Sequence, residues 1–327
     1  MKLHARFLQL PIEFDAELLA REIATIAPSD WKPHPLGFAG NDFLPLIAVN
    51  GDPDNEGFAG PMRPTPFLSA DRPYLTKTLG SLGAVLGRTR LMRLSGHAEV
   101  SEHADVNYYW RDRMRVHVPI VTQPTVSFHC ANVTVHMAPG ECWVFDTWSL
   151  HRVVNDQTHA RIHLVADTVG GEGFMRLLAA GRSPERPAPN WSARLLEAGG
   201  AQPAMEFEAT NLPKVMSPWE MREHLTFLLG EAMPNQPAAA DVARACGAFL
   251  HRWRALWAAF GEAEAGAARY RATLNQFVSD LKAARAGDLL LKNEVDFLET
   301  FNGMILSSAL SISARPATPD QSRGNAA

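Results

Sequence analysis

The feature that most constrains the fold is a series of eight short strand-like runs between residues 89 and 169. Turn signals such as Pro139-Gly140-Glu141 separate many of them. Short strands with frequent turns are typical of an antiparallel barrel or jelly roll, and eight is the strand number of a double-stranded jelly roll. The runs are TRLMRLS, AEVSEHA, MRVHVPIV, TVSFHC, VTVHM, CWVFD, HRVV and RIHLVADTV.

The segments on either side of these strands have helical patterns. Residues 15–26 carry apolar side chains at helical spacing. Ser217-Pro218-Trp219-Glu220 combines a Ser cap, Pro at the first helical position and Glu at the capping-box position, which predicts a helix start. Helical spacing then recurs up to residue 306, so we expect a small all-helical unit.

The predicted fold class is therefore α+β. A double-stranded β-helix core (jelly-roll, cupin-like) is expected together with N-terminal α/β elements and a C-terminal helical region. The expected parts are a jelly-roll domain over 1–170, a linker or packed arm over 171–216, a helical domain over 217–312 and a polar, disordered tail over 313–327.

Composition argues against several classes of protein. A net charge of −4 predicts neither a nucleic-acid surface nor a basic membrane-binding face. No run approaches the roughly 18 apolar residues of a spanning helix, and the N-terminus lacks the apolar core of a secretory signal. The cysteines, Cys130, Cys142 and Cys246, have no paired spacing, so we expect buried thiols in a cytoplasmic protein.

Two His-x-acid pairs stand out in GHAEVSEHADVNYYW, residues 96–110: His97 with Glu99, and His103 with Asp105. Residues two apart on a strand share a face and can hold a metal ion together. With 12 His and 35 acidic residues, about one such pair is expected by chance, so a third ligand is needed. Two His and one carboxylate with open positions suit non-haem Fe(II) oxygenases.

The third candidate ligand is His151, whose alternative role is that of a hydrogen-bonded core histidine. Ten residues later Arg161 shares a strand face with His163. A guanidinium near a metal can bind the remote carboxylate of a dicarboxylate cosubstrate in bidentate fashion. A structural salt bridge with Asp146 or Asp167 is the alternative for Arg161.

A second strand face carries the same two residue types, Arg115 and His117. Two strands that both present Arg and His to the inside are hard to explain by packing alone. Either residue could instead orient a metal ligand without touching the metal.

Residues 56–169 resemble the aspartyl/asparaginyl β-hydroxylase family of Fe(II)- and 2-oxoglutarate-dependent oxygenases. This region is about a third of the chain, and the order of its motifs is more specific than any one motif. The first 55 residues are expected to join the same unit, whereas the C-terminal helices carry no family feature. The matching elements are GPMRPTP, RLMRL, G-x-x-x-V-x-x-H-A-D, R-V-H-V-P-I, C-A-N, P-G-E-C-W-V-F-D, His151 and Arg161.

The resemblance implies which His-x-acid pair is the metal site. In the family pattern a Gly and an apolar residue precede the first metal His, and Gly96 and Val100 hold those positions here. The earlier pair is then a chance match. The implied Fe(II) ligands, which are also the implied catalytic residues, are His103, Asp105 and His151.

The resemblance also implies how the cosubstrates bind. Arg161 would hold the 5-carboxylate of 2-oxoglutarate, and Arg115 and His117 would line the pocket near its 1-carboxylate. O2 would take the last open position on the metal. Residues 1–170 would then form the oxygenase domain.

The implied reaction is hydroxylation of the β-carbon of an aspartyl or asparaginyl residue in a peptide or protein. Animal members of the family carry Gly where this chain has Asp105, so this chain keeps a full triad, as related bacterial amino-acid hydroxylases do. A free amino acid, such as proline, asparagine or aspartate, is therefore the alternative substrate.

Two other classes remain open from the sequence. One is a non-catalytic jelly roll that binds 2-oxoglutarate or metal. The other is a zinc hydrolase or isomerase on a cupin-like barrel. A homodimer interface, a docking surface for a substrate protein and simple support of the barrel are all compatible with the C-terminal helices.

Overall fold

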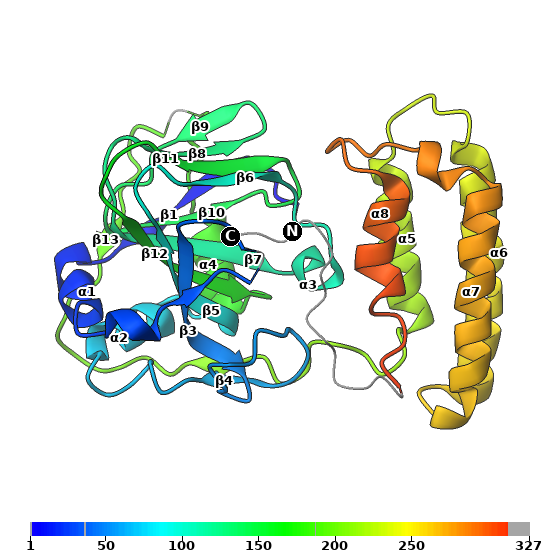
Figure 1. Ribbon diagram of the computed structural model, residues 1–327, viewed down its shortest axis with the longest axis horizontal. Coiled ribbons are helices and arrows are strands. Elements are labelled where there is room, and N and C mark those ends of the chain that lie inside the picture. The colour runs from blue at the N-terminus through cyan, green and yellow to red at the C-terminus, as the bar shows by residue number, and fades with distance from the viewer. Residues whose placement is uncertain (1, 36, 187, 313–327) are drawn as a thin grey trace. The chain divides into compact units, whose positions relative to one another are not determined.

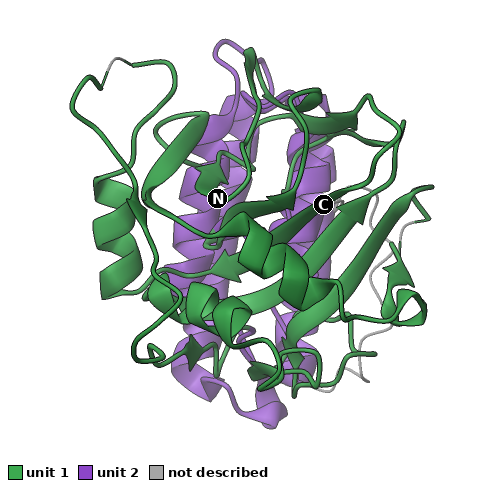
Figure 2. Cartoon of the chain, turned by 90° about the vertical axis from the view of Figure 1, so that its left-hand side faces the viewer, with its two compact units in different colours: residues 1–105, 112–211, 323–327 green, residues 106–111, 212–322 purple. Residues whose placement is uncertain are grey.

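The computed structural model divides the chain into a barrel unit and a helical unit, shown in different colours in Figure 2. The barrel unit contains residues 2–105 and 112–211, and the helical unit contains residues 106–111 and 212–312. The predicted tail, 313–327, lies outside the described residues. The structure describes residues 2–35, 37–186 and 188–312.

All eight predicted runs form strands, β5 to β12, and they are distributed over two sheets (Figure 1). The larger sheet holds four of them in the order β10-β7-β12-β5, and the smaller sheet has the order β6-β11-β8-β9. Strands that follow one another in the chain mostly lie in different sheets, which confirms the predicted double-stranded β-helix. Their bounds are β5 Val85–Leu94, β6 Glu99–His103, β7 Met114–Val121, β8 Val126–Cys130, β9 Val133–Val135, β10 Glu141–Phe145, β11 His151–Asn155 and β12 Arg161–Thr168.

Further strands extend the larger sheet on both sides. β1 pairs antiparallel with β10, and β3 pairs antiparallel with β5. Residues 171–216, expected to form a linker or packed arm, supply two short strands that pair with β1 and β5, and one helix. These additional strands are β1 Phe7–Glu13, β2 Lys32–Pro33, β3 Asn41–Val49, β4 Met62–Pro64, β13 Arg194–Leu195 and β14 Glu206–Phe207.

The core of the barrel unit lies between the two sheets. Phe128 of β8 and Phe145 of β10 meet there with ring centroids 6.5 Å apart. Burial of a side chain of this kind stabilises the fold by about 1.5–3 kcal/mol. The cluster draws on both sheets and contains Phe7, Leu94, Val100, Val126, Phe128, Cys130, Val135, Met137, Trp143, Phe145 and Val153.

The larger sheet is buried on both faces, as β7 shows. On the inner face of β7 lie two polar side chains, Arg115 and His117, whereas the residues of β7 on the opposite face are apolar. The predicted N-terminal helix is present as α1 and contacts β7. Asp15 caps this helix by accepting a hydrogen bond of 2.8 Å from the amide of Leu18. The helices of this unit are α1 Ala16–Ile23, α2 Pro73–Ser81 and α4 Glu172–Ala179.

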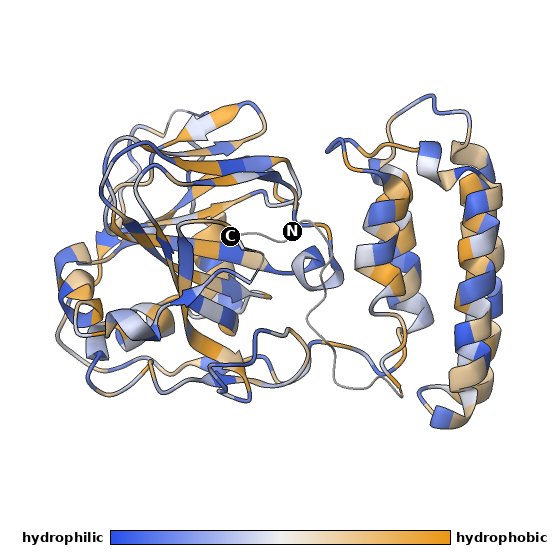
Figure 3. Ribbon diagram, in the orientation of Figure 1, coloured by the Kyte–Doolittle hydropathy of each residue, from blue (hydrophilic) through white to orange (hydrophobic). Residues whose placement is uncertain are grey.

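Helix α5 of the helical unit begins at the predicted cap, where Ser217 accepts a hydrogen bond from the amide of Glu220. The helices of this unit alternate hydrophilic and hydrophobic residues along their length (Figure 3), and Phe249 stacks on Phe277 inside the unit at 3.9 Å. None of the described helices has the length and apolar character to cross a membrane. The helices are α5 Pro218–Glu231, α6 Ala239–Phe260, α7 Ala267–Ala283 and α8 Phe297–Phe301, followed by a π-helical turn, Asn302–Leu306.

One short segment from the middle of the barrel sequence belongs to the helical unit. Residues 106–111, which include α3 (Tyr108–Arg111), are part of it. Tyr108 donates a hydrogen bond of 2.6 Å to Glu220 of α5. The chain therefore leaves the barrel unit directly after Asp105 and returns at Asp112.

A buried ion pair provides the first prediction. Arg113 binds both carboxylate oxygens of Glu208 at 2.8 Å, and both side chains are almost fully buried. Glu208→Gln removes the compensating charge, so we expect the free energy of unfolding to fall by about 3–5 kcal/mol in urea titrations.

The control is Asp42→Asn, which breaks the partly exposed pair between Arg93 and Asp42. It should cost less than about 1 kcal/mol. Equal effects of the two substitutions would contradict the structural importance of Glu208.

Candidate metal centre

Two histidines face each other in the smaller sheet. The antiparallel pairing of β6 with β11 places His103 opposite His151, with ring centroids 4.2 Å apart. Each Nδ1 donates to the backbone carbonyl two residues earlier, at 2.7 Å for Ser101 and 2.9 Å for Ser149. These bonds fix the tautomer and leave Nε2 of each ring as the nitrogen that could bind a metal.

Asp105 completes a group of three. Its amide donates to the carbonyl of Thr147 at 2.9 Å, which ties the end of β6 to the loop before β11. The potential ligand atoms of His103, Asp105 and His151 all lie within 4.8 Å of one another. Two imidazoles and one carboxylate form a donor set that suits Fe(II).

Orphaned polar atoms support the fit to a metal. Both carboxylate oxygens of Asp105 and Nε2 of His151 are buried without a hydrogen bond among the described residues. Burying such groups without a partner is costly, and buried charges are usually paired or coordinate a metal. Burial also lowers the pKa of His151 well below 6.5, assisted by His103, so the ring is neutral and ready to coordinate at neutral pH.

Arg161 lies at the start of β12 and is 3% exposed. Its guanidinium sits over the ring of Phe128 at 5.1 Å, and its Nε has no hydrogen-bond partner in the described part of the chain. Burial lowers the pKa of Arg161 to about 9, so the group remains a cation at neutral pH. A buried cation in this state calls for an anionic ligand.

The predicted alternative for Arg161, a salt bridge with Asp146 or Asp167, does not occur among the described residues. Asp146 instead pairs with Arg6 at 2.8 Å. Asp167 pairs with Arg115 at 3.3 Å. Both candidate partners are therefore committed to other arginines.

Arg115 and His117, the second Arg and His pair, have different surroundings. Arg115 reaches the metal-site carboxylate, with its Nη1 3.5 Å from Oδ2 of Asp105. His117 packs its ring against Phe128 and Phe145 at 5.5 and 5.3 Å. Burial lowers the pKa of His117 well below 6.5, with the charges of Arg161 and Arg115 adding to the effect, so its ring is neutral.

The competing pair of the sequence, His97 and Glu99, is exposed. Within the described ranges, a single group of three potential ligand residues converges, and these two residues are not part of it.

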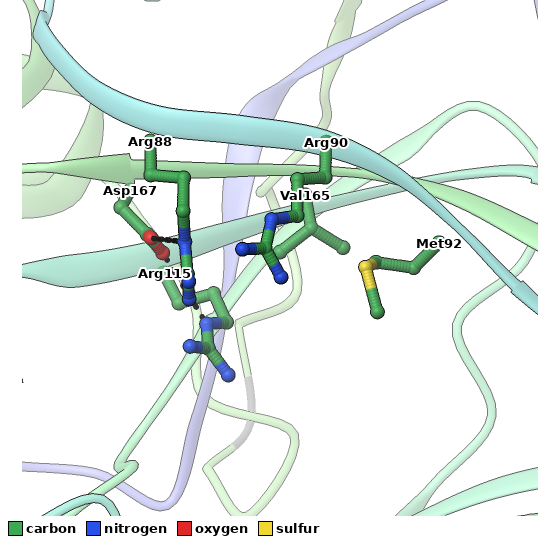
Figure 4. Close-up of a pocket in the computed structure, with 6 residues that line it drawn as sticks. All are labelled: Arg88, Arg90, Met92, Arg115, Val165 and Asp167. Carbon is green, nitrogen blue, oxygen red and sulfur yellow. Dashed lines mark hydrogen bonds and ion pairs between the residues drawn. The ribbon is translucent and has the colours of Figure 1, made fainter. Parts of the chain in front are cut away.

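The sequence reasoning overlooked two arginines inside the barrel. Arg90 lies opposite Val165 on the neighbouring strand, and cross-strand partners share a face, so Arg90 points inward. Arg88 precedes it by two residues, the spacing of a shared strand face. That spacing in GRTRLM was the available signal. Figure 4 shows the pocket lined by Arg88, Arg90, Met92, Arg115, Val165 and Asp167.

Residues 27–170 match the family model described as aspartyl/asparaginyl β-hydroxylase. This match confirms the resemblance predicted from the motifs and, with it, the predicted enzyme class, a 2-oxoglutarate-dependent hydroxylase. No curated protein matches the chain.

Similar solved structures have low sequence identity. A 2OG-Fe(II) oxygenase family oxidoreductase from Burkholderia pseudomallei is 16% identical, with 51% of this chain and 88% of that chain covered and a TM-score of 0.36. A prolyl-4-hydroxylase from Pseudomonas putida is 15% identical, with 50% and 92% covered and a TM-score of 0.33. A cupin domain from Bordetella pertussis is 17% identical, with 26% and 93% covered and a TM-score of 0.21.

The neutral histidines inside the barrel make its stability dependent on pH. His163 is fully buried, and neither ring nitrogen has a hydrogen bond to a described residue. Burial lowers its pKa well below 6.5, assisted by Arg161. The unfolded chain takes up a proton near pH 6.5, so this stability is present above pH 6.5 and is lost as pH falls.

His163→Phe should remove this proton uptake. Between pH 6.5 and the folded-state pKa, wild type should lose up to about 1.4 kcal/mol more per pH unit than the variant. Urea titrations at pH 7.5, 6.0 and 5.0 measure the difference. His159→Gln, at an exposed position, is the control and should follow wild type. Parallel profiles for wild type and His163→Phe would disprove the assignment.

Proposed function

Because residues 27–170 match the aspartyl/asparaginyl β-hydroxylase family model, we propose that this chain is an Fe(II)- and 2-oxoglutarate-dependent dioxygenase. It hydroxylates the β-carbon of an aspartyl or asparaginyl residue in a peptide or protein. The observation that carries the proposal is the convergence of His103, Asp105 and His151, whose potential ligand atoms lie within 4.8 Å of one another. Both carboxylate oxygens of Asp105 and Nε2 of His151 are buried without a hydrogen bond among the described residues.

The three residues of this group would hold Fe(II). When bound with 2-oxoglutarate and O2, the metal supplies the oxidising chemistry that hydroxylates a C–H bond and converts 2-oxoglutarate to succinate and CO2. Two histidines and one carboxylate leave coordination positions for these molecules. The hydrogen bonds from Nδ1 of His103 and His151 to backbone carbonyls keep both rings in the ligating orientation.

Arg161 would anchor the distal carboxylate of 2-oxoglutarate. Its guanidinium is buried and cationic, has no ion pair within the described part of the chain, and lies over the ring of Phe128. In such a site a bidentate pair with a carboxylate is stronger than in water. The apolar side chains of Phe128 and Phe145 exclude water from the same space.

Arg115 would act as a positioning residue through Asp105. Its contact with Oδ2 of Asp105, together with its ion pair to Asp167, holds the ligand carboxylate in place. His117, neutral and inward-facing, would line the space near the 1-carboxylate of 2-oxoglutarate.

A free amino acid is the second candidate substrate, because Asp105 gives this chain the complete triad. Mass spectrometry of reactions with peptides and with single amino acids separates the two. A product heavier by one oxygen atom from free proline, asparagine or aspartate, but from no peptide, would favour the free amino acid.

The first functional prediction concerns turnover without a hydroxylated substrate. Wild type with Fe(II), air and 2-oxoglutarate should release succinate slowly. Asp105→Ala and His151→Ala should each abolish release, because the metal loses a ligand. Succinate is measured by mass spectrometry. Full activity in either variant would rule out the assigned ligands.

A matched control comes from the chance pair. Glu99→Ala removes the carboxylate of the other His-x-acid motif, which is exposed, and should keep wild-type succinate release.

Arg161→Ala should weaken 2-oxoglutarate binding by roughly 10- to 100-fold, because a charge-assisted hydrogen-bonded contact is lost. An unchanged affinity in this variant would place the cosubstrate elsewhere.

A further inference from the structure

Arg90 is a buried cation that the proposed chemistry does not use. It is 6% exposed and lies on the inner face of β5, with its guanidinium over the ring of Phe43 at 4.4 Å. Its Nε has no hydrogen bond, and no ion pair to Arg90 occurs among the described residues. In Figure 4 no dashed line joins Arg90 to the other five residues drawn, whereas dashed lines connect Asp167 to other arginines.

The pocket around Arg90 has an excess of positive charge. Its lining contains three guanidinium groups and a single carboxylate, that of Asp167. This carboxylate already pairs with Arg115 at 3.3 Å and with Arg88 at 3.8 Å. Glu56 and Asp167 act on Arg90 only through longer-range attraction. The lining therefore lacks an anion for Arg90.

Arg113, a buried arginine of the same unit, differs from Arg90 because a carboxylate binds it. Arg113 is also buried, and Glu208 satisfies its guanidinium at two points. Burial lowers the pKa of Arg90 well below its ordinary value, and the charge of Arg88 adds to the effect. An unpaired buried cation destabilises the fold, and an anionic ligand would offset this cost.

The position of Arg90 separates it from the proposed cosubstrate anchor. Arg90 lies opposite Val165, four residues along β12 from Arg161. At a rise of about 3.3 Å per residue, the two positions are roughly 13 Å apart along the strand. Arg115 connects the pocket to the metal centre, because it lines the pocket and lies 3.5 Å from Asp105. The site thus has two separate cationic regions.

We propose that Arg90, with Arg88 beside it, binds a carboxylate of the hydroxylated substrate and selects aspartyl over asparaginyl side chains. This inference rests on the proposed function and specifies that the hydroxylated side chain is negatively charged. A guanidinium offers only hydrogen-bond donors, and a carboxylate meets them with two acceptor oxygens. The amide of asparagine presents one acceptor and one donor group, and its donor would face the donors of Arg90.

The test compares two capped amino acids, Nα-acetyl-aspartic acid amide and its asparagine counterpart. Calorimetry under exclusion of O2, with Fe(II) and saturating 2-oxoglutarate, measures their dissociation constants. Wild type should bind the aspartyl probe more tightly. Arg90→Gln should weaken the aspartyl probe by roughly 10- to 100-fold and the asparaginyl probe far less. Arg90→Lys, which keeps the charge without the planar fork, should retain part of the preference.

Arg93→Gln is the matched control. Arg93 lies on the same strand, faces the other side and pairs with Asp42 at 2.8 Å. This variant should bind both probes as wild type does.

Several results would overturn the inference. Failure of wild type to bind the aspartyl probe would do so, as would equal losses for both probes in Arg90→Gln. An unchanged probe preference in Arg90→Gln, with weakened 2-oxoglutarate binding, would assign Arg90 to the cosubstrate instead. Failure of the proposed function is a different result, because succinate release would be absent while the preference that depends on Arg90 persisted.

Discussion

The pairing of β6 with β11 is the interaction on which the rest of the site depends. It places His103 opposite His151, and it places Val100 opposite Val153 in the core between the sheets. The register shifts by one residue between these two pairs, as in a β-bulge. Regular alternation would turn Val100 and His103 to opposite faces, so the bulge lets one strand supply both a core residue and a candidate metal ligand. The packing that stabilises the barrel therefore also fixes the candidate metal centre.

The larger sheet completes the site and adds polar groups that the fold must compensate. Its inner face carries Arg161, His117 and His163, all buried. The histidines remain neutral because burial lowers their pKa, whereas Arg161 stays charged without an ion pair among the described residues. The apolar core and a helix on the other face of the sheet offset the cost of these groups. Function and stability thus oppose each other on a single sheet, which is typical of a preorganised site.

Local patterns predicted much of this arrangement. The eight strands follow from short runs with turns between them, and the order of motifs around His103 and Arg161 gave the family resemblance. Contacts between segments far apart in the chain could not be predicted from the sequence. β1 pairs with β10, more than a hundred residues later, and nothing in residues 106–111 shows that they join the helical unit. Arg88 was missed because its strand was expected to begin at residue 89, although β5 begins at Val85. Arg90 lies within the expected strand, but its lack of an ion pair among the described residues is a property of the folded chain.

The most direct test of the metal centre is a crystal structure of the protein grown without O2 in the presence of Fe(II) and 2-oxoglutarate. Anomalous scattering at the iron edge locates the metal independently of the refined coordinates. We predict one iron bonded to His103, Asp105 and His151, with the distal carboxylate of 2-oxoglutarate on Arg161. Iron at another position, or that carboxylate on Arg90, would contradict the assignment of these residues.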